Sequence, residues 1–215
     1  GADGVERISW LYRPRQWRGE KTPLVVLSYP GGPAAAPSEP AALNAWANPQ
    51  LVVSGGYAVL IPILPLDREK EPAEGYAEDV LPVVDAALAQ YPDLDPDRVA
   101  HWGHSFGGYA ALGIATRSRR FGAIVAWAAP TDMISHWGEL LSHARLWPQD
   151  ALSFAHPIGY AETGQGRMGA PPWEALDLYA AASPALLADR IRTPVLLITA
   201  DGDYVSHVQA ARMFA

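Results

Sequence analysis

Residues 99–109, VAHWGHSFGGY, are the stretch that decides the fold of this chain. They contain Gly103-His104-Ser105-Phe106-Gly107, a match to G-x-S-x-G, between a β-branched and aromatic run and a helical pattern of small residues. This strand–turn–helix context is the one that a nucleophile elbow requires. Only glycine fits two residues before and two residues after the serine, because a Cβ there would clash with the neighbouring backbone. The motif therefore predicts a serine hydroxyl at the C-terminal edge of a sheet, with helix N–H groups directed at it.

The composition indicates one soluble globular domain. The chain has 215 residues, of which 49% are hydrophobic and 18% charged, so we expect a single domain over 1–215 with a sizeable core. The net charge is −7 and there is no basic block or membrane-length apolar run, so we expect neither nucleic acid nor a membrane as partner. There is no cysteine, which excludes thiolate chemistry. No signal peptide is visible, and the compartment, cytoplasmic or periplasmic, stays open.

Strand and helix patterns alternate along most of the chain. Apolar or alternating runs predict strands at 6–13, 24–29, 57–61, the run before the elbow, 123–128 and 195–199. Helical spacing predicts helices at 43–53, 76–90, 109–116, 183–191 and 206–215. Residues 131–182 lose this alternation and carry several Trp and Tyr side chains. We interpret these residues as a helical excursion over the sheet edge that shapes a substrate pocket. The alternative is that its aromatic side chains only fill the hydrophobic core.

Alternating strands and helices imply right-handed crossovers and a mostly parallel sheet with helices on both faces, a three-layer α/β/α arrangement. Ligands of such folds bind beyond the C-terminal ends of the strands. Tyr29, Ser105 and Asp203 all lie at the C-terminal ends of predicted strands. We therefore expect these three residues at one edge of the sheet.

An ordered set of motifs resembles the catalytic domain of the prolyl oligopeptidase family of serine peptidases, especially its acylaminoacyl-peptidase and dipeptidyl-peptidase-like branches. The resemblance covers nearly the whole chain and implies an α/β-hydrolase fold. The elbow alone is shared by all α/β hydrolases, whereas the ordered set is more specific. Its members are Trp10–Pro14, Tyr29–Pro33, Glu78-Asp79-Val80, Asp95–Val99, Trp102–Tyr109, Ala129–Asp132, Met168-Gly169, Pro172-Trp173-Glu174, Ser183-Pro184 and Thr193–Ile198.

The resemblance implies roles for individual residues. Ser105 is the implied nucleophile, and Asp203 is the implied acid of the triad, with Asp201 as the fallback. One implied oxyanion donor is the backbone N–H of Phe106, and the other is the hydroxyl of Tyr29. The loop after Tyr29 has one residue more than the family pattern, so a backbone N–H near Gly31 or Gly32 is the alternative donor.

The chain departs from the family in its histidines. His207 is the only histidine after Asp203, and it lies too close to that acid for the usual base-bearing loop. His101 and His104 flank the elbow and are expected to be structural, and the remaining three, His136, His143 and His156, to be surface or pocket residues. None has metal-ligand spacing, so we expect neither metal nor cofactor. We expect the chain to be a piece that lacks the final strand, helix and histidine.

Three hypotheses about function remain. The first is a serine peptidase that hydrolyses peptide bonds through an acyl-enzyme on Ser105, with a propeller domain upstream in the full-length protein. The second is a carboxylesterase that acts on small acyl esters. The third is a truncated, catalytically silent hydrolase-fold fragment or binding module. The expected substrate is accordingly a peptide or a small acyl compound.

Overall fold

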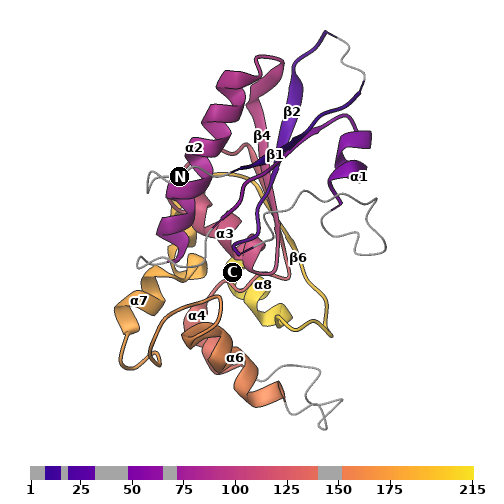
Figure 1. Ribbon diagram of the computed structural model, residues 1–215. Coiled ribbons are helices and arrows are strands. Elements are labelled where there is room, and N and C mark those ends of the chain that lie inside the picture. The colour runs from indigo at the N-terminus through magenta and orange to yellow at the C-terminus, as the bar shows by residue number, and fades with distance from the viewer. Residues whose placement is uncertain (1–7, 16–18, 32–47, 65–71, 140–151) are drawn as a thin grey trace.

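The computed structural model describes residues 8–15, 19–31, 48–64, 72–139 and 152–215. Within them a six-stranded sheet has the order β1-β3-β2-β4-β5-β6 (Figure 1). Every neighbouring pair is parallel except β1 and β3, which are antiparallel. This confirms the mostly parallel sheet. The strands are β1 (Trp10–Tyr12), β2 (Thr22–Leu27), β3 (Ala58–Ile61), β4 (Leu94–His104), β5 (Ala123–Trp127) and β6 (Val195–Ile198).

Helices lie between the strands and beyond the elbow. They are α1 (Pro49–Ser54), α2 (Pro72–Gln90), α3 (Phe106–Ala115), α4 (Met133–Trp137), α6 (Leu152–Glu162), α7 (Leu176–Ala181), the 3₁₀ helix η2 (Pro184–Arg190) and α8 (His207–Phe214). The helices α4, α6 and α7 gather at the end of the molecule where β4 passes into α3 (Figure 1). All three lie within residues 131–182.

Strand β2 shows why the sheet is covered on both faces. Its successive side chains point to opposite faces, and all are apolar from Leu24 to Leu27. Leu24 and Val26 join the large core beneath α2 and α3, whereas Val25 and Leu27 pack with Val59 and the α1 side chains of the other face. The result is three layers, with the larger core on the α3 side.

Helix α3 lies in the middle of that core. All of its residues, Phe106–Ala115, are buried, so the helix has no solvent-facing stripe. It contacts α2, β4 and β5. A helix that is apolar all round has to be covered on every side, and this fixes the elbow deep in the molecule.

Helix α2 and strand β4 both begin earlier than the sequence predicts. Helix α2 begins at Pro72 and not at Tyr76, so Pro82 lies well inside the helix, and its exposed position leaves the ring room on the solvent side. Strand β4 already begins at Leu94, before the apolar run at Val99, because Leu94 pairs with Thr22 across a register shift. The predicted segments 6–7 and 43–47 lie outside the described residues.

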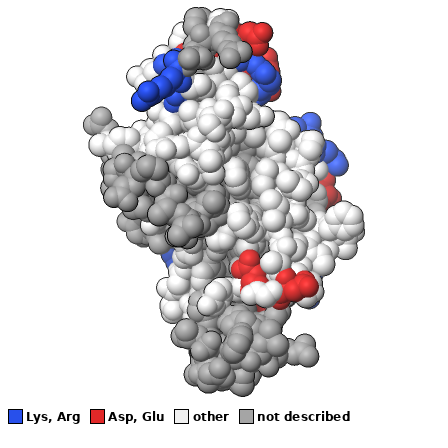
Figure 2. Space-filling model, turned by 90° about the vertical axis from the view of Figure 1, so that its right-hand side faces the viewer, with Lys and Arg blue, Asp and Glu red and all other residues white. Residues whose placement is uncertain are grey.

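The surface of the described residues has few charges over much of one face. On the face shown in Figure 2, charged side chains gather toward the upper end, at one side and in an acidic group near the lower end. No helix in the described ranges has the length and apolarity needed to cross a membrane.

Candidate active site

Ser105 joins β4 to α3 in a strained conformation. Its φ of 53° and ψ of −124° lie in a region that residues other than glycine rarely adopt. The Ser105 N–H donates to the Trp127 carbonyl of β5 at 2.7 Å, and the Ser105 carbonyl accepts from the Tyr109 N–H at 3.1 Å. The neighbouring strand and the helix therefore hold the serine from both sides.

Glycines around Ser105 allow this turn to close. A Cβ on Gly103 would lie 2.1 Å from the carbonyl carbon and oxygen of Gly107. A Cβ on Gly107 would lie 2.2 Å from the carbonyl oxygen of Ser28. Both contacts are with backbone, which cannot rotate away as a side chain can. These distances confirm the steric prediction made from the motif.

The first turn of α3 faces the same end of the sheet as Ser105. Phe106 is the first residue of the helix and its side chain is fully buried. The first N–H groups of a helix have no acceptor within the helix and carry the positive end of its dipole. The Phe106 amide belongs to this group, so the local structure suits a developing negative charge.

Tyr29 follows β2 and comes close to the elbow. Its ring carbon Cδ2 would be 3.4 Å from a Cβ on Gly107. The Tyr29 hydroxyl donates to Oε1 of Gln165 at 3.3 Å, and Nε2 of Gln165 donates to the Pro30 carbonyl at 3.4 Å. The alternative donor at Gly31 is engaged, because its N–H donates to the Leu64 carbonyl at 2.9 Å. Gly32 lies outside the described residues.

Tyr160 of α6 is a site residue that the sequence did not single out. Its ring meets Phe106 edge-on at 5.7 Å and its hydroxyl is buried. Burial raises the pKa of Tyr160 well above its usual value, the phenols of Tyr29 and Tyr76 raise it further, and the nearby Ser105 side chain lowers it. The hydroxyls of Ser105, Tyr29 and Tyr160 thus lie in one cluster. The only sequence signal was the presence of Tyr160 among the aromatics of 131–182.

Asp203 lies in the loop between β6 and α8. Its Oδ1 accepts from the Val205 N–H at 3.4 Å, and its own N–H donates to the Ala200 carbonyl at 3.3 Å. Burial lowers the pKa of His104, and the Asp203 carboxylate opposes this and raises it. The Asp203 carboxylate therefore lies close to His104, the residue that precedes Ser105. Strand pairing explains this, because His104 pairs with Trp127 and Trp127 with Ile198.

The histidines occupy different surroundings. His207 begins α8 and is exposed. His136 is buried, lies 3.3 Å from Glu139 Oε2 through its Nδ1 and meets Tyr160 edge-on at 5.4 Å, so it is not a surface residue. His143 and the side chain of His156 lie outside the described part. Among the residues that the structure describes, no group of three or more His, Asp or Glu could hold a metal ion.

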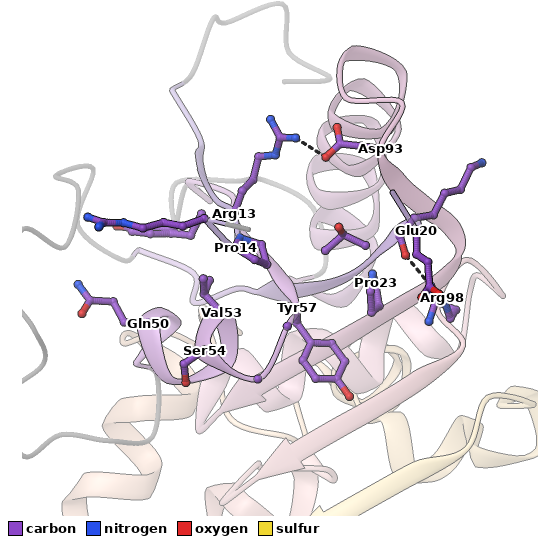
Figure 3. A pocket seen from close by; sticks show the side chains of 16 residues that line it. Arg13, Pro14, Glu20, Pro23, Gln50, Val53, Ser54, Tyr57, Asp93 and Arg98 are labelled. Atoms are coloured by element: carbon purple, nitrogen blue, oxygen red, sulfur yellow. Dashed lines mark hydrogen bonds and ion pairs between the residues drawn. The ribbon is translucent and has the colours of Figure 1, made fainter. Parts of the chain in front are cut away.

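A cavity of about 860 Å³ lies at the opposite end of the sheet. Residues at the end of β1 and at the starts of β2 and β3 line this cavity. Arg13 forms an ion pair with Asp93 at its edge (Figure 3). Ligands of parallel sheets bind at the carboxyl ends of the strands, where Ser105 lies. We therefore place the candidate active site at Ser105 and not in this cavity.

Comparison with known proteins points to one family. A sequence model of the prolyl oligopeptidase family matches residues 68–215. The uncharacterized peptidase YuxL of Bacillus subtilis is 28% identical over 152 residues, which is 63% of this chain and 22% of that protein. Dipeptidyl-peptidase 5 of Porphyromonas endodontalis is 25% identical over 221 residues, which is 94% of this chain and 28% of that protein. The chain spans less than a third of the length of these curated relatives.

Solved structures share the fold. An acylaminoacyl peptidase of Pyrococcus horikoshii matches with a TM-score of 0.69 and 21% identity, over 97% of this chain and 33% of that chain. A puromycin-hydrolyzing peptidase of Mycobacterium tuberculosis matches with a TM-score of 0.70 and 21% identity, over 96% of this chain and 30% of that chain. The sheet and its helices thus have the α/β-hydrolase fold.

Proposed function

This chain belongs to the prolyl oligopeptidase family, and on that premise we propose that it carries the nucleophile of a serine peptidase. One observation supports this most directly. Ser105 keeps a strained backbone beside a helix N-terminus, with the hydroxyls of Tyr29 and Tyr160 in the same cluster. A serine held in this way is arranged for attack on a carbonyl carbon and not for packing.

We propose that the reaction proceeds through an acyl-enzyme. The Ser105 Oγ bonds to the carbonyl carbon while a base takes its proton, and the carbonyl oxygen becomes an oxyanion. The Phe106 N–H and the Tyr29 hydroxyl donate to that oxyanion. The C–N bond then breaks as the carbonyl re-forms, and the leaving amine takes the proton from the base. Water attacks the resulting ester, which releases the acyl group as a carboxylic acid and returns the proton to Ser105 Oγ.

Asp203 is the proposed acid of the triad. Its carboxylate would stabilise an imidazolium that forms when the base accepts the serine proton. This assignment is supported by the Asp203 carboxylate, which raises the pKa of His104, the residue before Ser105. His207 is exposed at the start of α8, and we assign the role of base to no histidine of this chain.

The Tyr29 hydroxyl is the preferred second donor on present geometry. The N–H of Gly31 is already used by the Leu64 carbonyl, so using it for an oxyanion would break a backbone hydrogen bond. The contact of the Tyr29 hydroxyl with Oε1 of Gln165 is 3.3 Å, which is long for a hydrogen bond between oxygen atoms. Removing an oxyanion donor of this kind typically costs about 10²–10³ in kcat.

Substitution of Ser105 tests the proposal. In the full-length protein, Ser105→Ala should reduce hydrolysis of aminoacyl or dipeptidyl amides by several orders of magnitude and abolish labelling by a fluorophosphonate. Ser54→Ala, an exposed serine of α1, is the matched control and should change neither. Unchanged amide turnover in Ser105→Ala would exclude the proposal.

The same preparation separates the alternatives. Turnover of p-nitrophenyl esters without turnover of amides would indicate a carboxylesterase. A wild-type protein that neither hydrolyses these substrates nor reacts with the fluorophosphonate would indicate a silent hydrolase domain.

A further inference from the structure

A buried hydrogen bond between side chains links the two strands that carry the candidate site. The Oγ of Ser28 and the Nε2 of His101 are 2.6 Å apart. Ser28 directly follows β2, and His101 lies in β4 opposite Val26. Both residues are buried, His101 completely. The strand that leads to Tyr29 and the strand that leads to Ser105 are thus joined beneath the site.

Packing alone gives no reason for an imidazole at this position. The His101 ring lies against Phe121 at 4.8 Å, and burial lowers its pKa to about 3, so the ring is neutral. Its Nδ1 makes no hydrogen bond to any described residue. A buried polar atom without a partner costs free energy that an aliphatic side chain would avoid. The hydrogen bond to Ser28 is therefore the feature that distinguishes His101 from an aliphatic residue at this position.

Ser28 lies where the backbone pairing of the strands stops. The pairing of β2 with β4 ends at Leu27 and Trp102, so Ser28 is the first residue beyond it. The Ser28 carbonyl oxygen would lie 2.2 Å from a Cβ on Gly107, which means that it packs directly on the first turn of α3. The next residue is Tyr29. An interaction that fixes the position of Ser28 therefore also fixes the point at which the chain leaves the sheet toward Tyr29, the start of what we call the Tyr29 loop.

We propose that His101 is a positioning residue for acyl transfer: through Ser28 it holds the start of the Tyr29 loop against the elbow. The Tyr29 hydroxyl and the Phe106 amide can then act on the same oxyanion. This inference rests on the proposed function, because it concerns the alignment of the two proposed donors. Misplacement of a catalytic group by about 1 Å can cost about 10²-fold in rate.

Two variants of the full-length protein test the inference. Ser28→Ala removes one partner with little change in volume, and His101→Leu removes the other. In both we expect kcat for an aminoacyl amide to fall about 10- to 100-fold while KM stays within about twofold. His101→Gln offers an amide near the position of Nε2 and should recover part of the loss.

A matched control separates positioning from stability. Thr116→Val removes another buried hydroxyl, which donates to the Gly113 carbonyl at 2.8 Å at the far end of α3. It should lower the melting temperature and leave kcat unchanged. If His101→Leu does not fold, Ser28→Ala decides the test.

The outcomes distinguish this inference from the proposed function. If wild-type turnover depends on Ser105, but Ser28→Ala keeps the wild-type kcat, the pair is only structural and the inference is wrong. If the wild-type protein shows no turnover that depends on Ser105, the proposed function fails and the inference fails with it. A selective loss of kcat with recovery in His101→Gln supports the inference.

Discussion

Ser105 keeps a backbone conformation that typically costs about 1–3 kcal/mol. The cost is tolerated because the surrounding backbone leaves no alternative. Gly103, Gly107 and the Ser28 carbonyl are packed so closely that a Cβ at either glycine would clash with backbone atoms. At this scale the site depends on the absence of side-chain atoms as well as on the hydroxyl.

We expect Gly103→Ala to disrupt the elbow. The added Cβ would lie 2.1 Å from backbone atoms of Gly107, so the turn would have to open. Overpacking of this kind costs about 1–3 kcal/mol, occasionally more. Thermal denaturation should show a lower melting temperature, and fluorophosphonate labelling of Ser105 should be lost. Gly122→Ala is the control, because its nearest neighbours are at 3.8 Å. Equal melting temperatures for the two variants would contradict the prediction.

His101 should make the protein less stable in acid. Burial lowers its pKa from 6.5 to about 3, so between these values the unfolded chain binds a proton that the folded chain does not. Stability should therefore fall as the pH drops through this range, by about 1.4 kcal/mol per pH unit from this residue. Above about pH 6.5 both states are neutral at His101 and the contribution does not change with pH.

Urea denaturation at a neutral and a mildly acidic pH measures this effect. The free energy of unfolding of the wild-type chain should decrease more steeply with acid than that of His101→Gln, which has no group that titrates there. If the free energy of unfolding fell equally with acid in both proteins, His101 would not contribute to the loss of stability.

At the scale of elements, α8 closes the loop that carries Asp203. The side chain of Gln209 is fully buried, and its Oε1 accepts from the N–H groups of Thr131 and Asp132, both at 3.0 Å. The Thr131 hydroxyl donates to the Gln209 carbonyl at 2.6 Å. The loop is thus held at one end by the pairing of β6 with β5 and at the other by this contact after β5.

Gln209→Ala should loosen that attachment. Each buried N–H group left without an acceptor costs about 1–3 kcal/mol, and this variant leaves two. Arg212→Ala serves as the comparison, because Arg212 is half exposed and its pair with Asp132 at 2.7 Å should contribute about 1 kcal/mol or less. Urea denaturation should rank Gln209→Ala as clearly the less stable variant. The reverse order would show that α8 is held by other contacts.

At the scale of the whole molecule, β6 forms an edge of the sheet. It pairs with β5, and no other described strand pairs with it. The side chain of Leu196 is 56% exposed on this strand, and Phe214 of α8 is 88% exposed. An edge strand with exposed apolar side chains can pair with another chain.

We therefore expect the 215-residue chain to self-associate in isolation. Leu196→Lys should reduce association, because a charge on an edge strand opposes pairing with a second copy. Leu51→Lys is the control, since Leu51 is also exposed but lies on α1. Sedimentation velocity over a range of concentrations measures the effect. A wild-type chain that stays monomeric throughout would contradict it.

Most of the sheet could be predicted because apolar runs and helical spacing are local signals. Boundaries that differed from the prediction include one that is set by a contact with a residue distant in the sequence. Strand β4 starts early because Thr22 offers a pairing partner at Leu94, and no local pattern contains that information. Pro82 sits inside α2 because the helix begins earlier than its apolar spacing suggested.

A Cβ on Gly107 would meet the Ser28 carbonyl, so that clash is tertiary, whereas the clash between Gly103 and Gly107, and with it the turn at Ser105, follows from the local sequence. The identity of the side chains around it does not. Tyr160 reaches Ser105, and Asp203 acts on His104, only after separate helices and strands have packed. Which side chains meet at a sheet edge depends on how the elements between them are placed. That placement is set by burial across the whole core, which a local pattern does not encode.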